Sequence, residues 1–469
     1  MGSVKADTSK THRRSCHVVA MPYPGRGHIN PMMNLCKLLA SRGSGSGSSS
    51  DDILISFVVT EEWLSFIGSD PKPDNIRFRS IPNVIPSEKG RAGNFAGFLE
   101  EVMTKVEDPF EKLLDQLELE TPATAIIADT YLVWAVGVGN RRNIPVASLW
   151  TMSPPVFSMF YHFDLLVQNG HFPANLSERG HELIDYIPGI SSICLADLPT
   201  IFNGAGREVL GRVKEAISWV PKAQCLLFTS FYELDTKSTD ALRAALPFPV
   251  YPVGPSIPHM TPKDKKNINE DYINWLDSQS EGSVLYVSLG SFLSVSSDQM
   301  DEIAAGLHDS GFPFLWIARQ DTSRLQKACG EKGLVIPWCD QLRVLCHSSI
   351  GGFWSHCGWN STLESVFSGT PMLTFPIFWD QMPNSKLIAD DLGNGWRVKK
   401  VGSGDENEVV KRDDIARTVQ RFMDNSGEGS KEMKRRAREL QLACQGAIDK
   451  AGSSATNLDA FVRDILQHP

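Results

Sequence analysis

The chain has 469 residues, of which 42% are hydrophobic and 22% charged, which is enough apolar material for two or three packed domains. This composition excludes a disordered chain and a small scaffold held by disulfides or a metal. The formal net charge of −9 disfavours nucleic acid and anionic membrane surfaces as the main partners, so a small molecule is the expected ligand.

The apolar runs and the cysteines bear on the compartment. No apolar run approaches the ~18 residues of a membrane span, and the basic start of the chain has no apolar segment behind it. The nine cysteines are scattered, odd in number and never spaced C-x-x-C, as is typical of free thiols in a reducing compartment. We therefore expect a cytoplasmic protein without a membrane span.

The first half of the chain alternates between predicted strands and helices. Apolar runs at residues 16–21, 53–59, 124–128 and 145–149 predict buried strands. Residues 22–30 predict a Gly/Pro loop, residues 31–42 an amphipathic helix, and the low-complexity stretch 43–52 a surface loop. This alternation is typical of a parallel sheet covered by helices.

A proline-rich stretch separates this half from a second one of the same kind. Six prolines between residues 247 and 262 predict an interdomain linker. Beyond it, strands are predicted at 283–289, 314–318, 334–336, 350–354 and 372–375, with a helix at 298–308. We expect an α/β fold of two doubly wound, Rossmann-like domains, whose strand ends face each other across a ligand-binding cleft.

One helix start in the second half has two interpretations. After the strand at 350–354, a glycine leads through Asn360 and Ser361 into a helical pattern, with Glu364 three residues after Ser361 as in a capping box. The same helix start could bind a phosphate through its free N–H groups. A second glycine turn at Gly290 could close on the same phosphate, and the sequence leaves both interpretations open.

The stretch 338–381, which contains this helix start, resembles the signature of the plant UDP-sugar-dependent glycosyltransferases. It runs without a gap over 44 positions from a Trp to a terminal Asp-Gln. The segments PYPGRGHINPM near the start, SFYELD at 230–235, YPVGP at 251–255 and LYVSLGS at 285–291 extend the resemblance over nearly the whole chain. It implies a GT-B fold with an acceptor-binding domain at 1–248, a linker at 249–262, a UDP-sugar-binding domain at 263–449 and a C-terminal helix at 450–469 that packs back on the first domain.

The resemblance also implies a role for each residue of the donor site. Trp338 would stack on the uracil, and the Cys339 backbone would bind its edge. Gln341 and Glu364 would bind the ribose hydroxyls. The diphosphate would be bound by Ser291, His356, Asn360 and Ser361. The sugar would be bound by Trp359, Asp380 and Gln381. The chain departs from the family at Asp340, where proline is common, and at the bulky Trp354 and Trp379, which bear on the loop shape and on the size of the sugar pocket.

The candidate catalytic pair lies in the first half. His28 follows the first strand, and Asp129 ends a later one. Read alone, a histidine after a glycine loop is more often structural and an isolated aspartate is more often a helix cap. The resemblance instead makes His28 the general base and Asp129 the carboxylate that orients its ring.

These observations together predict an inverting transfer of glucose from UDP-glucose to a hydroxyl of a small lipophilic molecule by a monomer. No cofactor or metal is expected, because the chain has no Asp-x-Asp and no clustered His/Cys set. The alternatives are a metabolite-binding protein with a silent site and a nicotinamide-dependent oxidoreductase, which lacks its G-x-G-x-x-G fingerprint here. Aromatic residues that might line the acceptor site are Phe95, Phe98, Trp150, Phe157, Phe160 and Tyr161.

Overall fold

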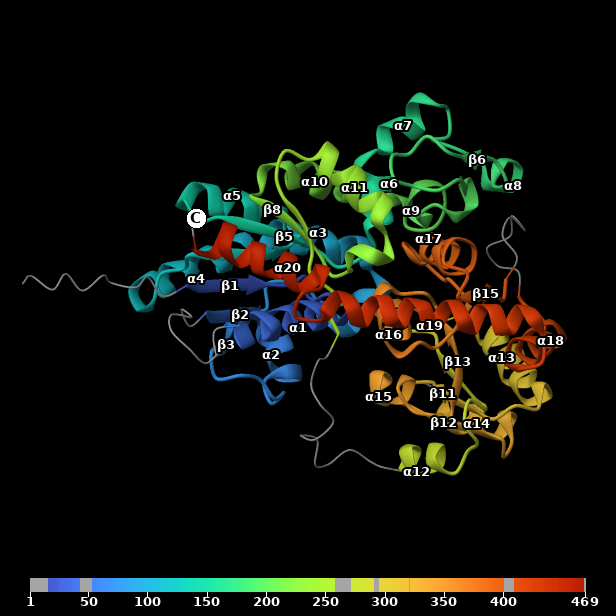
Figure 1. The fold of residues 1–469 in the computed structure, drawn as a ribbon. Coiled ribbons are helices and arrows are strands. Elements are labelled where there is room, and N and C mark those ends of the chain that lie inside the picture. Colours follow the sequence, from blue (N-terminus) through green and yellow to red (C-terminus); the bar gives the residue numbers. More distant parts are fainter. Residues whose placement is uncertain are drawn as a thin grey trace, which may run out of the picture.

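Two separate parallel sheets organise the chain (Figure 1). The computed structural model describes residues 16–42, 53–257, 271–290, 295–319, 321–399 and 409–467. The loop expected at 43–52, and the end of the linker expected at 249–262, lie outside these residues. Each sheet is covered by helices on both faces, so the expected α/β architecture of two doubly wound halves is confirmed.

The first sheet has seven parallel strands in the order β3-β2-β1-β4-β5-β8-β9. The four strands predicted in this half are present, and β3, β8 and β9 were not predicted. The strand order reverses between β1 and β4, and such switch points are where open α/β sheets bind ligands. The strands are β1 (His17–Met21), β2 (Leu54–Thr60), β3 (Ile76–Ile81), β4 (Ala125–Asp129), β5 (Val146–Trp150), β8 (Cys225–Phe228) and β9 (Val250–Pro252).

The second sheet has six parallel strands in the order β12-β11-β10-β13-β14-β15. Its switch point lies between β10 and β13, and the five predicted strands are present together with an unpredicted edge strand, β15. The strands are β10 (Val284–Ser288), β11 (Phe314–Ile317), β12 (Gly333–Ile336), β13 (Ile350–Ser355), β14 (Met372–Thr374) and β15 (Gly395–Arg397). A short antiparallel pair, β6 (Leu183–Ile184) and β7 (Ile193–Cys194), lies apart from both sheets.

The helices divide between the two halves. Those of the first half are α1 (Arg26–Arg42), α2 (Glu61–Ile67), α3 (Phe95–Lys105), α4 (Glu107–Glu120), α5 (Val133–Arg142), α6 (Pro154–Tyr161), α7 (Phe163–Gln168), α8 (Leu176–Arg179), α9 (Thr200–Asn203), α10 (Leu210–Trp219) and α11 (Thr236–Ala245). Those of the second half are α12 (Asp271–Asp277), α13 (Ser297–Ser310), α14 (Thr322–Cys329), α15 (Gln341–Leu345), α16 (Trp359–Ser368), α17 (Gln381–Lys386), α18 (Arg412–Met423), α19 (Glu428–Ile448) and α20 (Ser453–Phe461).

Both faces of the central strands are buried, which explains their continuous apolar runs. Val18 and Val19 are neighbours on β1 and are fully buried, yet they belong to different cores because successive side chains of a strand point to opposite faces. At the C-terminal end, α19 crosses the second half and α20 turns onto the first sheet (Figure 1). Leu458 and Phe461 of α20 lie in the same core as Val18.

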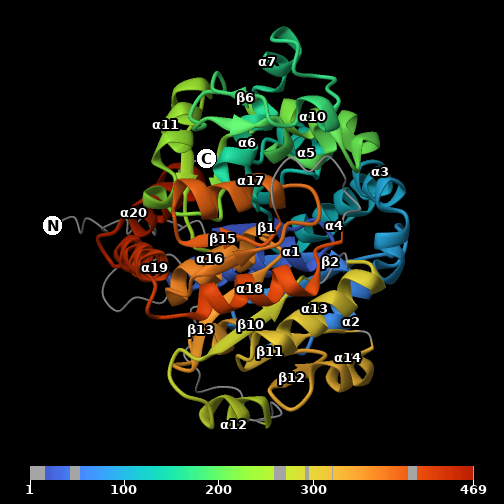
Figure 2. The ribbon, with the colours of Figure 1, turned by 90° about the vertical axis from the view of Figure 1, so that its right-hand side faces the viewer.

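The carboxyl edges of the two sheets face each other and are joined by direct contacts. A small apolar cluster brings Phe231 and Leu234 of the first half against Trp359 and Leu363 of α16. Helix α17 lies between the first half and β15 (Figure 2). The sequence elements that follow the two switch points therefore come together in one region.

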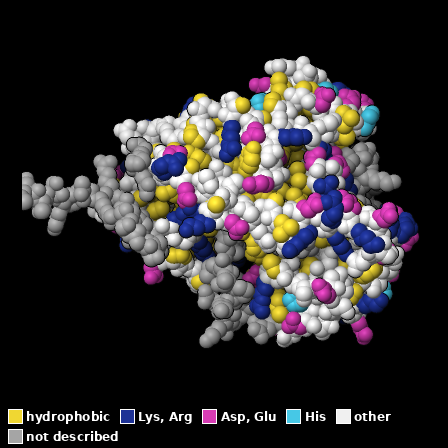
Figure 3. Space-filling model, in the orientation of Figure 1, with side chains coloured by type: hydrophobic (Ala, Val, Ile, Leu, Met, Phe, Trp, Pro, Cys, Tyr) yellow, Lys and Arg dark blue, Asp and Glu magenta, His cyan; other side chains and the backbone are white. Residues whose placement is uncertain are grey.

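The surface and the cysteines match the sequence expectations. Acidic and basic side chains are interspersed over the face drawn in Figure 3, without a large patch of either sign. The nine cysteines are free thiols. Within the described residues, none of the helices has the length and apolar character needed to cross a membrane.

Candidate active site

His28 lies in the first turn of α1, so the loop predicted through residue 30 is wrong. Glycine and proline suggested a loop, but Pro31 is tolerated close to a helix start, where its missing N–H removes a single bond. The carbonyl left without that bond belongs to Gly27, four residues earlier. This carbonyl instead accepts a hydrogen bond from the side-chain Nδ2 of Asn360, in the second half, at 2.9 Å. The proline thus frees an acceptor beside His28 that the other half uses.

The His28 ring is held by side chains from two neighbouring strands. Its Nδ1 lies 2.7 Å from Asp129 Oδ2 at the end of β4 and 3.0 Å from Thr151 Oγ1 just after β5. Asp129 is 2% exposed, and its second oxygen accepts the backbone N–H of Tyr131 at 3.0 Å. A carboxylate at Nδ1 leaves Nε2 as the nitrogen able to take a proton. The predicted pairing of His28 with Asp129 is present.

Aromatic rings surround this pair. The Tyr23 ring centroid lies 4.9 Å from that of His28, and the Tyr131 centroid lies 6.1 Å from it. Both hydroxyls are buried and have no hydrogen-bond partner among the described residues. Burial raises the pKa of Tyr131, and the carboxylates of Asp129 and Asp380 add to that rise. Both phenols stay neutral, so they present O–H donors next to the base.

Three of the six aromatic residues singled out from the sequence contact the rings around His28. The Phe98 centroid lies 6.1 Å from that of Tyr23, and the Trp150 centroid lies 5.8 Å from that of Tyr131. Phe95 stands edge-on to Trp379, with a centroid distance of 5.5 Å, and Trp379 in turn contacts Tyr131. All six belong to the core of the first half or pack against it. Tyr131, which was not among the residues singled out from the sequence, contacts the His28 ring directly.

At the uridine end of the predicted donor site, Trp338 is 57% exposed, an unusual exposure for a tryptophan and the one that a stacking platform needs. The neighbouring Cys339 is buried, with its sulfur 3.4 Å from the Tyr286 hydroxyl. Asp340, where the family commonly has proline, is the N-cap of α15 and accepts the Arg343 N–H at 3.3 Å. This departure is therefore explained by capping.

Gln341, Ser361 and Glu364, which are predicted to meet the ribose and the diphosphate, form one hydrogen-bonded group. Gln341 Nε2 donates to Glu364 Oε2 at 2.6 Å and to Ser361 Oγ at 2.9 Å. The Tyr286 hydroxyl donates to Gln341 Oε1 at 3.1 Å. Burial raises the pKa of Glu364 to about 7, against the lowering effect of Gln341. A carboxyl group in this state gains from further donors, and vicinal hydroxyls supply two.

The capping interpretation of Asn360 and Ser361 is wrong. Helix α16 begins at Trp359, its N-cap is Gly358, and no side chain caps it. Asn360 and Ser361 are therefore inside the first turn, where the backbone N–H groups have no partner within the helix. Such a helix start has the free donors and the positive dipole end that favour an anion.

His356 completes this helix start. A Cβ atom added to Gly290 would lie 2.7 Å from its Nε2, and one added to Gly358 would lie 2.5 Å from it, so both glycines are needed for the ring to fit. Burial lowers the pKa of His356 to about 4, and its Nδ1 has no partner among the described residues. The ring is a neutral donor. The glycine turn after β10 thus meets the α16 start as predicted, whereas Ser291 lies outside the described residues.

The three residues predicted to meet the sugar have different surroundings. Asp380 is 9% exposed, and burial raises its pKa to about 6. The Gln381 amide oxygen accepts the backbone N–H groups of Ile377 and Phe378 at 2.8 and 3.0 Å. The Trp359 indole is buried in the apolar cluster between the halves, and its contact with the sugar stays a prediction.

The two bulky departures from the family have different positions. Trp354 is fully buried in the core of the second half, so it does not shape a sugar pocket. Trp379 adopts a left-handed backbone with φ 62°. Its N–H donates to Thr200 Oγ1 at 2.9 Å, and its carbonyl accepts the Thr200 N–H at 3.1 Å. This reciprocal pair holds Trp379 against the first half, next to Asp380.

Sequence reasoning missed several residues of the site. Thr151 touches His28, Ser153 bonds to Asn384, and Asn384 bonds to Asp380. A weak signal existed for Thr151, which follows a buried strand as Asp129 does, and for Asn384, which stands four residues after Asp380 on a helix. Within the described ranges, His, Cys, Asp and Glu side chains do not gather in groups of three or more that could hold a metal ion.

These features define a class of protein. Two doubly wound halves meet at their switch points, with a histidine–carboxylate pair on one side and an anion-binding helix start on the other. Chemically, the arrangement suits a proton acceptor placed next to a phosphorylated substrate. It is the arrangement of a two-domain group-transfer enzyme of the GT-B type.

The chain belongs to the UDP-glycosyltransferase family. The family profile described as UDP-glucoronosyl and UDP-glucosyl transferase matches residues 196–411. The chain is 52% identical over 454 residues to UDP-glycosyltransferase 87A2 of Arabidopsis thaliana, with 96% of each chain covered. It is 30% identical over 508 residues to 7-deoxyloganetin glucosyltransferase of Catharanthus roseus, with 100% of each covered.

Solved structures agree on the fold. A UDP-glucosyltransferase from Polygonum tinctorium that glucosylates indoxyl, in complex with 3,4-dichloroaniline, superposes with a TM-score of 0.82 at 26% identity, over 97% of this chain and 99% of that one. Medicago truncatula UGT71G1 in complex with UDP-glucose superposes with a TM-score of 0.77 at 25% identity, over 96% and 98%. The chain is thus a UDP-glycosyltransferase with the GT-B fold.

Proposed function

We propose that this enzyme transfers glucose from UDP-glucose to a hydroxyl group of a small lipophilic acceptor, with inversion at the anomeric carbon. The observation that carries the proposal is the 2.7 Å contact of His28 Nδ1 with the buried Asp129, which leaves Nε2 as a base. The contact of Asn360 with the Gly27 carbonyl puts the start of α16 beside this base. A base next to an anion site suits a nucleophile that attacks a phosphate-linked carbon.

In the proposed reaction, His28 Nε2 takes the proton of the acceptor hydroxyl as its oxygen bonds to the anomeric carbon. The bond from that carbon to the UDP oxygen breaks on the opposite face, and UDP leaves. Asp129 keeps the proton of the ring on Nδ1 and stabilises the imidazolium that forms. No metal cofactor takes part in this proposal, because the α16 start and the neutral His356 would receive the diphosphate charge.

The preference for glucose rests on Asp380 and Gln381. A carboxylate accepts hydrogen bonds from two neighbouring hydroxyls, and an amide both donates and accepts. The Gln381 oxygen is engaged by backbone N–H groups, so the amide nitrogen is the group that remains for the sugar. In the family that the signature resembles, a terminal Gln accompanies glucose most often.

The rings next to His28 favour a flat, lipophilic acceptor. Phe95, Tyr131 and Trp379 offer apolar faces, and among the described residues the buried Tyr23 and Tyr131 hydroxyls have no hydrogen-bond partner. A flat phenolic or terpenoid molecule would cover the rings, and its oxygen atoms would satisfy the hydroxyls, since a buried unpaired polar group costs about 1–3 kcal/mol. Related proteins are named or described for small acceptors of this size.

Donor competition tests the proposal. With one fixed phenolic acceptor, UDP-glucose is expected to give the highest kcat/KM among UDP-glucose, UDP-galactose, UDP-xylose and UDP-glucuronate. Gln381→Ala should lower that kcat/KM roughly tenfold, as expected for a lost hydrogen bond to the donor. Product mass and the anomeric coupling in NMR identify the linkage. A clear preference for another donor, or a product with retained configuration, would overturn this assignment.

A further inference from the structure

One buried side chain that the mechanism above does not use joins both halves of the enzyme. Asn384, on α17, is fully buried. Its Oδ1 accepts the Ser153 hydroxyl of the first half at 2.9 Å. Its Nδ2 donates to the Cys357 carbonyl at 3.0 Å and to Asp380 Oδ2 at 2.8 Å. A buried amide costs free energy unless it is paired, and this one pairs its oxygen and makes two bonds through its nitrogen.

Each of the three partners of Asn384 belongs to a different part of the site. Ser153 stands two residues after Thr151, whose hydroxyl contacts His28. Cys357 has a left-handed backbone with φ 67° and connects the phosphate-end histidine to the start of α16. Asp380 is the carboxylate assigned to the sugar. One amide therefore connects the base side, the diphosphate loop and the sugar end.

We propose that Asn384 is a positioning residue for glycosyl transfer: it holds Asp380 and the Cys357 loop in register with the half that carries His28. The proposal rests on the proposed function, because it concerns the distance between the bound sugar and the base. Reaction by in-line displacement is sensitive to that distance, and a misplacement of about 1 Å can cost a hundredfold in rate. Asn384 does not touch the reacting atoms, so its effect acts through Asp380 and the loop.

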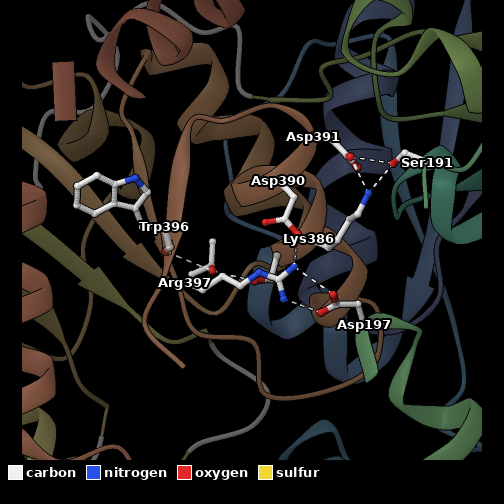
Figure 4. Close-up of polar contacts among 9 residues, drawn as sticks. Ser191, Asp197, Lys386, Asp390, Asp391, Trp396 and Arg397 are labelled. Atoms are coloured by element: carbon white, nitrogen blue, oxygen red, sulfur yellow. Dashed lines mark hydrogen bonds and ion pairs between the residues drawn. The ribbon is translucent and has the colours of Figure 1, made fainter. Parts of the chain in front are cut away.

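Residues 386–397, which run from the end of α17 to β15, also contact the first half. These contacts hold the segment in place, so that the Asn384 amide has only a small displacement of Asp380 to control. Figure 4 shows Arg397 of β15 reaching Asp197, with contacts of 2.7 and 3.2 Å, and Lys386 reaching Ser191 at 2.5 Å. Within the second half, Asp391 also pairs with Lys386, and Asp390 also pairs with Arg397. The charged contacts dock the segment, and the Asn384 amide then sets the position of its sugar-facing end.

A double-mutant cycle across the interface tests the proposal. Ser153→Ala removes one bond of the amide and is expected to lower kcat about tenfold. Asn384→Ala removes all three and is expected to lower it about a hundredfold. The double variant should be no slower than Asn384→Ala, because both changes act through the same amide. A wild-type kcat in Ser153→Ala, or a double variant slowed by the product of the two single effects, would overturn the proposal.

Asn394 provides a matched control within the same half. It is also fully buried, but its side-chain atoms have no hydrogen-bond partner among the described residues. Asn394→Ala should leave kcat per folded enzyme at the wild-type value, with the folded fraction and melting temperature measured for every variant. An equal loss of kcat in Asn394→Ala would show a general effect of a core change and would contradict a positioning role for Asn384.

A binding measurement separates this proposal from the proposed function. By calorimetry without acceptor, Asn384→Ala should reduce the ratio of UDP-glucose affinity to UDP affinity about tenfold. The reason is that Asp380, which would bind the sugar, loses its donor, whereas Trp338 and Gln341, which would bind the uridine, are unchanged. A wild-type enzyme that transfers no glucose would defeat the proposed function and leave this test valid. An unchanged affinity ratio would overturn the role of Asn384 even in an active enzyme.

Discussion

The two halves of this enzyme build their parts of the site in opposite ways. The donor side is nearly continuous in sequence, because Trp338 and Gln381 bound one stretch that contains most of its residues. The base side is assembled from the ends of separate strands, and His28 and Asp129 are 101 residues apart. A continuous site can be recognised from its motif, whereas a discontinuous one needs the fold to bring its members together.

The two sides nevertheless follow one physical rule. In each sheet the key residues follow strands at the switch point: β1 and β4 in the first sheet, and β10 and β13 in the second. At a switch point the connections leave in opposite directions, so the carboxyl edge stays open to a ligand. The halves differ in what they place there: a histidine–carboxylate pair, the proposed base, in one, and an uncapped helix start, the proposed anion site, in the other.

Replacing the base should break this division of labour most strongly. His28→Ala is expected to lower kcat for transfer to a neutral alcohol about 10²–10⁴-fold, because general-base catalysis is lost. UDP affinity, measured by calorimetry, should stay near the wild-type value, since the uridine residues belong to the other half. His162→Ala, which removes another imidazole of the first half, is the control. Wild-type transfer in His28→Ala would refute the base assignment.

Changing the carboxylate should have a smaller effect on the same step. Asp129→Asn keeps the shape but removes the charge that supports the imidazolium, and a hydrogen bond to a charged group contributes about 1.5–3 kcal/mol, or roughly 10- to 100-fold in kcat. Thr151→Val, which removes the weaker contact to the same nitrogen, should cost less. Steady-state kinetics with one acceptor compares the two, and unaltered kinetics in Asp129→Asn would reduce Asp129 to a turn residue that accepts the Tyr131 N–H.

The donor side should respond in binding rather than in chemistry. Trp338→Ala is expected to weaken UDP binding by about 1–3 kcal/mol through loss of the stacking face. Trp219→Ala, a partly buried tryptophan of the first half, should leave UDP affinity unchanged and serves as the matched control. Calorimetry that gives equal UDP affinity for wild type and Trp338→Ala would remove the uracil assignment.

On the donor side, Glu364 should make the stability of the folded enzyme depend on pH. Burial raises its pKa to about 7 from 4.5, so the folded state keeps a proton that the unfolded chain has lost between these values, and stability falls as the pH rises through them. Glu364→Gln should therefore raise the melting temperature at pH 8 by ~2–4 °C, with a smaller gain at pH 5. UDP affinity should fall in the same variant. If wild type and Glu364→Gln differed in melting temperature by the same amount at pH 5 and pH 8, the pKa of Glu364 would not be raised in the folded state.

The sequence by itself determined the α/β class, most strands of both sheets and the continuous stretch that carries the proposed donor site. These properties depend on local patterns: apolar runs for strands buried on both faces, and a motif within one stretch. It misjudged the start of α1, because a proline near a helix start costs little once its freed carbonyl finds Asn360. It also allowed a capping role for Asn360 and Ser361, which the observed start of α16 at Trp359 excludes.

The tertiary structure decided what no local pattern contains. Thr151 joins His28 across 123 residues, and Ser153 joins Asn384 across 231. Neither serine nor threonine nor asparagine is unusual where it stands in the sequence, and each becomes informative only when the two sheets meet. The reason is physical: a hydrogen bond depends on distance and angle between two groups, and for groups in different halves both are set by how the sheets pack.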